Sequence, residues 1–228
     1  MRIVTLPGVF RPISDTWMLA EVLRTQIVGP RASVLDVCTG SGALAVCAAL
    51  RGAREVTAVD VSRRAVLTAR INARLNGARV RAVRSDLFSA LGDATFDLIV
   101  SNPPYVPAPT DELPTRGSQR AWDAGRDGRA LLDRLLGEAP AHLRPNGVLL
   151  VVQSDIIGVQ DTMEAMRDGG LEPDVALRRR GSLGPLMRAR VAHLEQHGLL
   201  ARGRREEDVV VIRGRARAVR AAARPAAA

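Results

Sequence analysis

The sequence has few of the residues that mark secreted, membrane-spanning or metal-binding proteins. Cys38 and Cys47 are its only cysteines and form no CxxC pair, so neither a disulfide framework nor a zinc site is expected. No apolar run reaches the length of a membrane span, and residues 1–30 lack a charged head followed by an apolar stretch. We therefore expect a cytoplasmic protein without a membrane segment or a bound metal.

Aromatic residues and lysine are also scarce. Aromatic residues make up 3% of the chain and hydrophobic residues 46%, so the core must be built from Val, Leu, Ile and Ala. Lysine is absent, and all 33 basic residues are Arg. Residues 178–228 hold thirteen Arg and four acidic residues, which accounts for the net charge of +9, because residues 1–177 hold twenty of each. This basic end permits contact with nucleic acid, although a solvated tail explains it as well.

Apolar strands alternate with amphipathic helices along most of the chain. This alternation predicts an α/β domain over residues 1–213, with a parallel sheet covered by helices on both faces, and a disordered Arg/Ala-rich tail over residues 214–228. Strands are expected at residues 33–38, 55–60, 79–83, 96–101, 148–152, 171–177 and 208–213, with a turn at 145–147. Helices are expected at residues 14–27, 42–50, 62–76, 129–143 and 159–168, and an inserted helix at about 183–197.

A glycine-bearing loop follows the first expected strand. Gly40 and Gly42 lack a Cβ, so the backbone is free to bend sharply and to approach a ligand closely. Ligands of open parallel sheets bind at the carboxyl ends of the strands, where this loop lies. Taken alone, the loop also fits the relaxed fingerprint of dinucleotide-binding proteins.

Three acidic residues at successive strand ends separate these two interpretations. Asp36 is expected to face the amino group of a ligand, Asp60 its two ribose hydroxyls, and Asp86, followed by Leu87, its adenine amino group. Strand-end aspartates also cap helices, but three in register are poorly explained in that way. Three carboxylates suit a cationic sulfonium amino acid better than a pyrophosphate. The pattern therefore favours S-adenosylmethionine, which becomes S-adenosylhomocysteine on methyl transfer.

The sequence Asn102-Pro103-Pro104-Tyr105 directly follows the fourth expected strand. The prolines stiffen the loop and keep Asn102 out of helical dihedrals. The Asn102 side-chain oxygen and the Pro103 carbonyl are then expected to accept both hydrogens of one NH2 group, while Tyr105 stacks on its plane. Two acceptors stabilise the positive charge that grows on the nitrogen during methyl transfer, without a strong general base. The expected chemistry is N-methylation of a planar amide or amine.

These motifs, in this order, resemble the HemK family of class I methyltransferases. More specific are Phe10-Arg11-Pro12-Ile13-Ser14-Asp15-Thr16 and Ala121-Trp122-Asp123-Ala124-Gly125-Arg126-Asp127-Gly128-Arg129, which are similar to the compact branch of the family. The resemblance implies a Rossmann-like, seven-stranded, mostly parallel sheet with an antiparallel last strand. It implies catalytic roles for Asn102, Pro103 and Tyr105, and substrate binding by these three residues together with Pro104. It implies a cofactor site of Thr16, Asp36, Cys38, Gly40, Gly42, Asp60, Asp86, Leu87 and Asn102, in which Cys38 replaces a glycine common in the family.

The resemblance also implies a substrate, the side-chain amide of a glutamine in a protein such as a translation release factor. Adenine- and guanine-methylating enzymes share the Asn-Pro-Pro-Tyr motif, so N-methylation of an RNA or DNA base stays open as the alternative. Eukaryotic members use a small zinc-binding partner, but no stretch of this sequence indicates a surface for an activator subunit.

The connection between Tyr105 and Asp127 is long for a compact domain. Loops of this length are commonly functional lids or disordered segments. We expect a lid that orders over the substrate, with Trp122 as its packing anchor.

Overall fold

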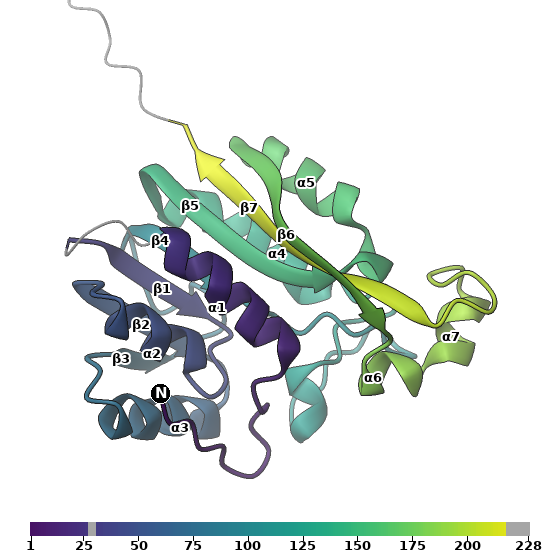
Figure 1. Ribbon diagram of the computed structural model, residues 1–228, viewed down its shortest axis with the longest axis horizontal. Helices are drawn as coiled ribbons and strands as arrows, with labels where there is room; N and C mark the ends of the chain where they lie inside the picture. Colours follow the sequence, from purple (N-terminus) through teal and green to yellow (C-terminus); the bar gives the residue numbers. More distant parts are fainter. Residues whose placement is uncertain (27–30, 218–228) are drawn as a thin grey trace, which may run out of the picture.

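The computed structural model describes residues 1–26 and 31–217, which fold around one seven-stranded sheet (Figure 1). Its order is β3-β2-β1-β4-β5-β7-β6, and β7 is antiparallel to both neighbours while the other neighbouring pairs are parallel. The expected Rossmann-like sheet with an antiparallel last strand is therefore confirmed. The strands are β1 (Ser33–Val37), β2 (Glu55–Asp60), β3 (Arg81–Arg84), β4 (Phe96–Ser101), β5 (Leu143–Ser154), β6 (Leu171–Ser182) and β7 (Glu206–Ala216).

Helices cover both faces of this sheet. The cluster on one face contains residues of α1 (Ser14–Gln26), α2 (Ala43–Leu50) and α3 (Arg63–Leu75), and the cluster on the other contains residues of α4 (Ala130–Glu138) and α5 (Val159–Asp168). Successive strand residues point to opposite faces, so Val34 joins the first cluster and Leu35 the second. Both clusters are mainly aliphatic, as the composition requires. No helix in the described ranges is long and apolar enough to cross a membrane.

Two helices expected as continuous are interrupted. Residues 129–143 form α4 and then a 3₁₀ turn, η2 (Ala139–His142), because Pro140 lacks the N–H that an α-helix interior needs. Residues 183–197 form α6 (Pro185–Arg188) and α7 (Val191–Gln196). The break falls at Arg190, whose backbone has φ −115° and is not helical. The Arg190 side chain donates to the Pro107 carbonyl. Two further 3₁₀ turns are η1 (Ser118–Ala121) and η3 (Asp155–Ile157).

The last two strands are longer than expected. They pair with each other from Leu171↔Ala216 to Ser182↔Glu206, mostly through polar residues that give no hydrophobic pattern. Consequently β7 runs to Ala216, past the expected start of the tail at residue 214, while residues 218–228 lie outside the described ranges. This long antiparallel pair brings the carboxyl end of β6, and with it α6 and α7, to the edge of the sheet where β1 and β4 end (Figure 1).

Smaller differences concern element ends. The expected turn at residues 145–147 is an irregularity inside β5, where the pairing with β4 jumps from Phe96↔Leu143 to Leu98↔Val148. The first strand ends at Val37 rather than at residue 38, and β3 covers Arg81–Arg84 rather than residues 79–83. Helix α2 begins one residue late, at Ala43, and the expected end of α1 at residue 27 lies outside the described ranges.

Candidate active site

A cavity of about 1080 Å³ lies at the carboxyl ends of β1, β2, β3 and β4. It is closed by the segment before α1, by the stretch that contains η1, and by the turn from β6 into α6. Of the predicted site residues, ten line it and two, Asp36 and Gly42, do not. The ten are Thr16, Cys38, Gly40, Asp60, Asp86, Leu87, Asn102, Pro103, Pro104 and Tyr105.

The loop after β1, residues 38–42, takes left-handed backbone conformations at three positions. Cys38 has φ +57°, which explains why glycine suits this position and why cysteine is strained there. Gly40 has φ +53° and borders the cavity. Gly42 has φ +79°, but a Cβ there would lie 2.7 Å from the Ala69 Cβ. Its glycine is therefore needed for the packing of this loop on α3, while the expected close approach of Gly42 to a ligand stays a prediction.

Asp36 does not face the cavity as the sequence suggested. Its Oδ2 accepts hydrogen bonds from the Thr39 hydroxyl (2.5 Å) and the Ala45 N–H (3.0 Å), so it holds the loop onto the start of α2. Its Oδ1 is buried without a hydrogen-bond partner among the described residues. Burial raises the pKa of this carboxyl to about 7. The structure thus gives Asp36 a place behind the loop.

Asp60 and Asp86 both line the cavity but differ in environment. Asp60 accepts from the Gly40 N–H (2.9 Å) and the Ser62 N–H (2.8 Å), and burial raises its pKa. Two backbone donors fix its orientation, and each oxygen keeps a further lone pair for a ligand hydroxyl. Asp86 is half exposed and pairs with Arg134 at 3.1 Å. Leu87 beside it has φ +45°, is buried, and gives this end of the cavity an apolar wall.

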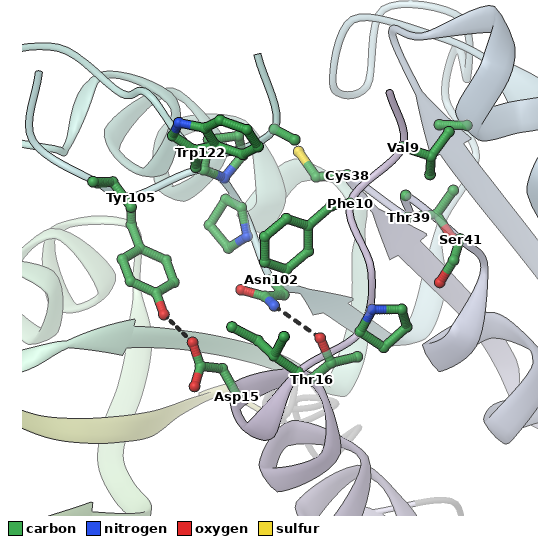
Figure 2. A pocket seen from close by; sticks show the side chains of 18 of the residues that line it. Val9, Phe10, Asp15, Thr16, Cys38, Thr39, Ser41, Asn102, Tyr105 and Trp122 are labelled. Atoms are coloured by element: carbon green, nitrogen blue, oxygen red, sulfur yellow. Dashed lines mark hydrogen bonds between the residues drawn. The ribbon is translucent and has the colours of Figure 1, made fainter. Parts of the chain in front are cut away.

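The loop of residues 102–105, called the acceptor loop below, is anchored from three sides. The Ser101 hydroxyl donates to the Val37 carbonyl (2.8 Å) and ties the end of β4 to β1. The Asn102 Nδ2 donates to the Thr16 hydroxyl at 3.2 Å, drawn as a dashed line in Figure 2. Because the amide nitrogen is engaged by Thr16, the Asn102 oxygen is left as the free acceptor. The residues expected to grip an NH2 group therefore have the required polarity.

Tyr105 is fixed by Asp15, which belongs to the Phe10 to Thr16 motif but was not among the expected site residues. Its hydroxyl donates to the Asp15 carboxylate, which lies beside Thr16 at the start of α1 (Figure 2). Burial, first of all, raises the pKa of Tyr105 well above its usual value, so it is a proton donor in this bond. Phe10 and Trp122 also point into this part of the cavity (Figure 2). Three of the six aromatic residues of the chain, Phe10, Tyr105 and Trp122, line this one cavity. The scarcity of aromatic residues was therefore the sequence signal that could have pointed to the site.

The stretch after the acceptor loop holds it by backbone contacts. The Val106 N–H donates to the Trp122 carbonyl (2.8 Å), and the Ala124 N–H donates to the Val106 carbonyl (3.1 Å). A Cβ on Gly128 would lie 2.6 Å from the Tyr105 carbonyl oxygen, so only glycine lets the chain pass so close. Trp122 packs against an apolar cluster here, in keeping with the expected anchor, while movement of a lid stays a prediction.

The inserted helices complete this support. Leu183, Met187 and Leu194 form an apolar cluster with Val106 and pack against Tyr105 and Trp122. Arg190 donates to the Pro107 carbonyl (2.6 Å) and pairs with Asp123 at 2.5 Å. Glu207 of β7 lines the cavity and accepts from the Gly184 N–H at 2.7 Å. Sequence spacing gave no sign of these contacts, because 67 residues separate Arg190 from Asp123.

Comparisons with known proteins identify methyltransferases as similar to this chain. Residues 1–114 match the model of the methyltransferase small domain family. A protein of Methanocaldococcus jannaschii that is assigned as a protein N5-glutamine methyltransferase is 32% identical over 181 residues, which cover 79% of this chain and 90% of that protein. The release factor glutamine methyltransferase of Bordetella pertussis is 42% identical over 151 residues, covering 63% of this chain and 56% of the relative. The chain thus spans about half of that longer relative.

One solved structure covers nearly the whole chain. The E. cuniculi Mtq2–Trm112 complex, described as responsible for the methylation of the eRF1 translation termination factor, is similar with a TM-score of 0.63 at 22% identity. The similarity covers 92% of this chain and 99% of that chain, and it supports the fold.

Proposed function

From the premise that this chain belongs to the HemK family of methyltransferases, we propose that it transfers a methyl group from S-adenosylmethionine to the side-chain amide nitrogen of a glutamine in a protein. A translation release factor is the proposed substrate, because a relative with that specificity is 42% identical to this chain over 151 residues. The observation that carries the proposal is the orientation of Asn102, whose amide nitrogen is engaged by Thr16 and whose oxygen is free to accept.

The cavity suits the proposed methyl donor in charge and shape. Asp60 and Asp86 supply carboxylates for hydroxyl and amino groups, and Leu87 supplies an apolar surface for an adenine ring. The bound cofactor would supply an electrophilic methyl group on a positively charged sulfur. Gly40 lets the backbone come close to the ligand, and Thr16 links the cofactor side to Asn102.

The acceptor loop is proposed to bind the target NH2 group with two carbonyl oxygens, those of Asn102 and Pro103. These acceptors hold the nitrogen in line with the methyl group and stabilise the positive charge that it gains. The aromatic side chains of Phe10, Tyr105 and Trp122 offer walls for a planar amide. Since these groups are held by α1, by residues 106–129 and by the inserted helices, they are arranged before the substrate arrives.

The basic end of the chain gives little support to a nucleic-acid substrate. Nine of its Arg side chains in residues 178–217 form ion pairs with acidic residues of this protein. Arg213, for example, pairs with Asp174 at 2.6 Å. Their charge is therefore largely balanced locally, and protein methylation is the better-supported function.

Labelling of a whole-cell extract tests the proposal. The protein is incubated with S-adenosylmethionine labelled in its methyl group, and the extract is then separated into protein, RNA and DNA. We expect label in the protein fraction, at a glutamine side chain that tandem mass spectrometry locates in a release factor. Label found only in RNA or DNA would show that the methyl acceptor is a nucleic-acid base and not a glutamine.

A further inference from the structure

The proposed reaction releases a proton, and the acceptor loop has no group to receive it. A methylated amide nitrogen that still carries both hydrogens is strongly acidic, so one N–H bond must break as the N–CH3 bond forms. The oxygens of Asn102 and Pro103 are amide carbonyls, which accept hydrogen bonds but do not retain a proton at neutral pH. A proton acceptor must therefore be found among the other groups around the cavity, and this step rests on the proposed function.

Few side chains that line the cavity are able to act as a base. No histidine lines it in the described ranges. Asp60 and Asp86 follow β2 and β3, on the cofactor side of the cavity. Burial raises the pKa of both Cys38 and Tyr105 far from neutrality, so both stay protonated. The remaining acidic groups are Asp15 and Glu207.

Asp15 is placed directly beside the acceptor loop. It precedes Thr16, which binds Asn102, and its own Oδ2 accepts the Tyr105 hydroxyl (Figure 2). The Ser14 hydroxyl donates to its Oδ1 at 2.9 Å. The residue is 8% exposed, and no Arg forms an ion pair with it in the described ranges. Two hydroxyl donors thus orient a buried carboxylate whose remaining lone pairs are free to take a proton.

Glu207 is the neighbouring acid, brought to the same floor of the cavity by β7. It is 6% exposed, accepts from the Gly184 N–H, and also lacks an ion-pair partner among the described residues. Burial raises its pKa, and the negative charges of Asp15 on α1 and Asp155 on η3 add to this, while hydrogen bonds from Ser154 and Gly184 oppose it. Glu207 therefore holds a proton more firmly than an exposed carboxyl does.

We propose that Asp15 is the proton acceptor of the reaction. As the nitrogen forms its bond to the methyl carbon, the S–CH3 bond breaks and its electron pair stays on sulfur. The N–H bond breaks, and the proton moves to the Asp15 carboxylate. Before the proton leaves, the two carboxylates also stabilise the positive charge on the nitrogen.

The pH dependence of kcat separates this role from a purely structural one. With a release factor as the methyl acceptor, Asp15→Asn should lower kcat by about 10² to 10⁴-fold and remove the acidic limb of the pH profile. Asp15→Glu, which keeps a carboxyl, should recover part of the rate. Glu207→Gln keeps the Asp15 carboxyl and should therefore retain the acidic limb. Glu206→Gln, at an exposed neighbouring position, serves as the matched control with an unchanged profile.

Three results would overturn the proposal. The first is a kcat for Asp15→Asn within about threefold of wild type. The second is a loss of kcat with an unchanged pH profile that Tyr105→Phe reproduces, which would leave Asp15 as a positioning residue. If Asp15→Asn does not fold, a wild-type pH profile of kcat without an acidic limb decides against the proposal. Wild-type labelling of a nucleic-acid base would instead refute the glutamine substrate, and the same variants would then be measured on that base, whose amino group also loses a proton.

Discussion

At the scale of single residues, the site depends on hydrogen bonds that leave one specific atom free. Thr16 engages the nitrogen of Asn102 and so exposes its oxygen, and Asp15 engages the hydroxyl of Tyr105. Asp36 shows the opposite arrangement, since its free oxygen is buried and has no partner among the described residues. The burial of the Asp36 carboxyl makes the stability of the protein depend on pH.

We expect the stability of the protein to fall as the pH rises from about 4 to about 7. The pKa of Asp36 is raised from 3.8 to about 7 in the folded state, so the folded protein binds a proton that the unfolded chain releases in this range. This stabilisation is fully present below the unfolded pKa of 3.8 and is lost as the pH rises through the folded pKa of about 7. The loss in unfolding free energy amounts to about 4 kcal/mol at most. Denaturant unfolding at several pH values measures this slope.

Asp36→Asn is the matched variant for that slope, because it removes the titrating group and keeps a side chain of the same size. The variant should show a flatter dependence of the unfolding free energy on pH between about 4 and 7. An unchanged slope would assign the pH dependence to other groups, of which Asp60 is the first candidate because burial raises its pKa too.

At the scale of elements, the acceptor loop is positioned by segments far away in the sequence. Residues 106–129 hold it by backbone hydrogen bonds, and α6 and α7 pack against that stretch. Strands β1 and β4 and residues 148–152 of β5 could be predicted because each is a short, mostly apolar run. The supporting contacts could not, because the Arg190–Asp123 pair and the Gly128–Tyr105 approach depend on tertiary geometry rather than on local pattern.

Gly128→Ala tests the close approach to Tyr105. Its φ of +77° strains any other residue, and its Cβ would lie 2.6 Å from the Tyr105 carbonyl oxygen. We expect a loss of stability and a large loss of kcat from the displaced acceptor loop. Gly170→Ala is the control, since Gly170 has φ +79° and nothing within 4 Å of its Cβ. That variant should lose only about 1–2 kcal/mol, with kcat unchanged. Equal effects of the two variants on kcat would refute the positioning role.

A double-mutant cycle tests the support from the inserted helices. Arg190 and Asp123 form a largely buried pair, with side chains 18% and 10% exposed. Arg190→Met and Asp123→Asn should each lower stability and kcat, and the double variant should lose less than the sum of the two. A coupling free energy of about 0.5–3 kcal/mol is expected. Additive losses would show that α7 does not act on the loop through this pair.

At the scale of the whole molecule, the sequence predicted the sheet but not the full length of β7 or the packing of the loop after β1. The hydrophobic pattern stops at residue 213, while β7 continues to Ala216 because its last residues pair with β6. The motif placed Asp36 and Gly42 in the cofactor site, while packing uses them to hold α2 and α3 in place. A motif gives the residues of a loop, and the packing of its neighbours decides which of them reach the ligand.

Removing residues 218–228 tests the role of the basic end without disturbing β7. We expect methyl transfer to a protein acceptor to continue at the wild-type rate, because the ion pairs of residues 178–217 are retained. RNA binding, measured by fluorescence anisotropy at several salt concentrations, should be weak before and after truncation. A clear loss of affinity with a flatter salt dependence would instead favour the nucleic-acid alternative.

The central claim is that Asn102 grips the nitrogen that receives the methyl group. It is tested most directly by comparing Asn102→Ala with wild type in one assay, in which mass spectrometry follows methylation of a release-factor glutamine. Cofactor affinity is measured on the same samples. We expect a loss of kcat of about 10² to 10³-fold with cofactor affinity nearly unchanged. A variant that still methylates at the wild-type rate would contradict it.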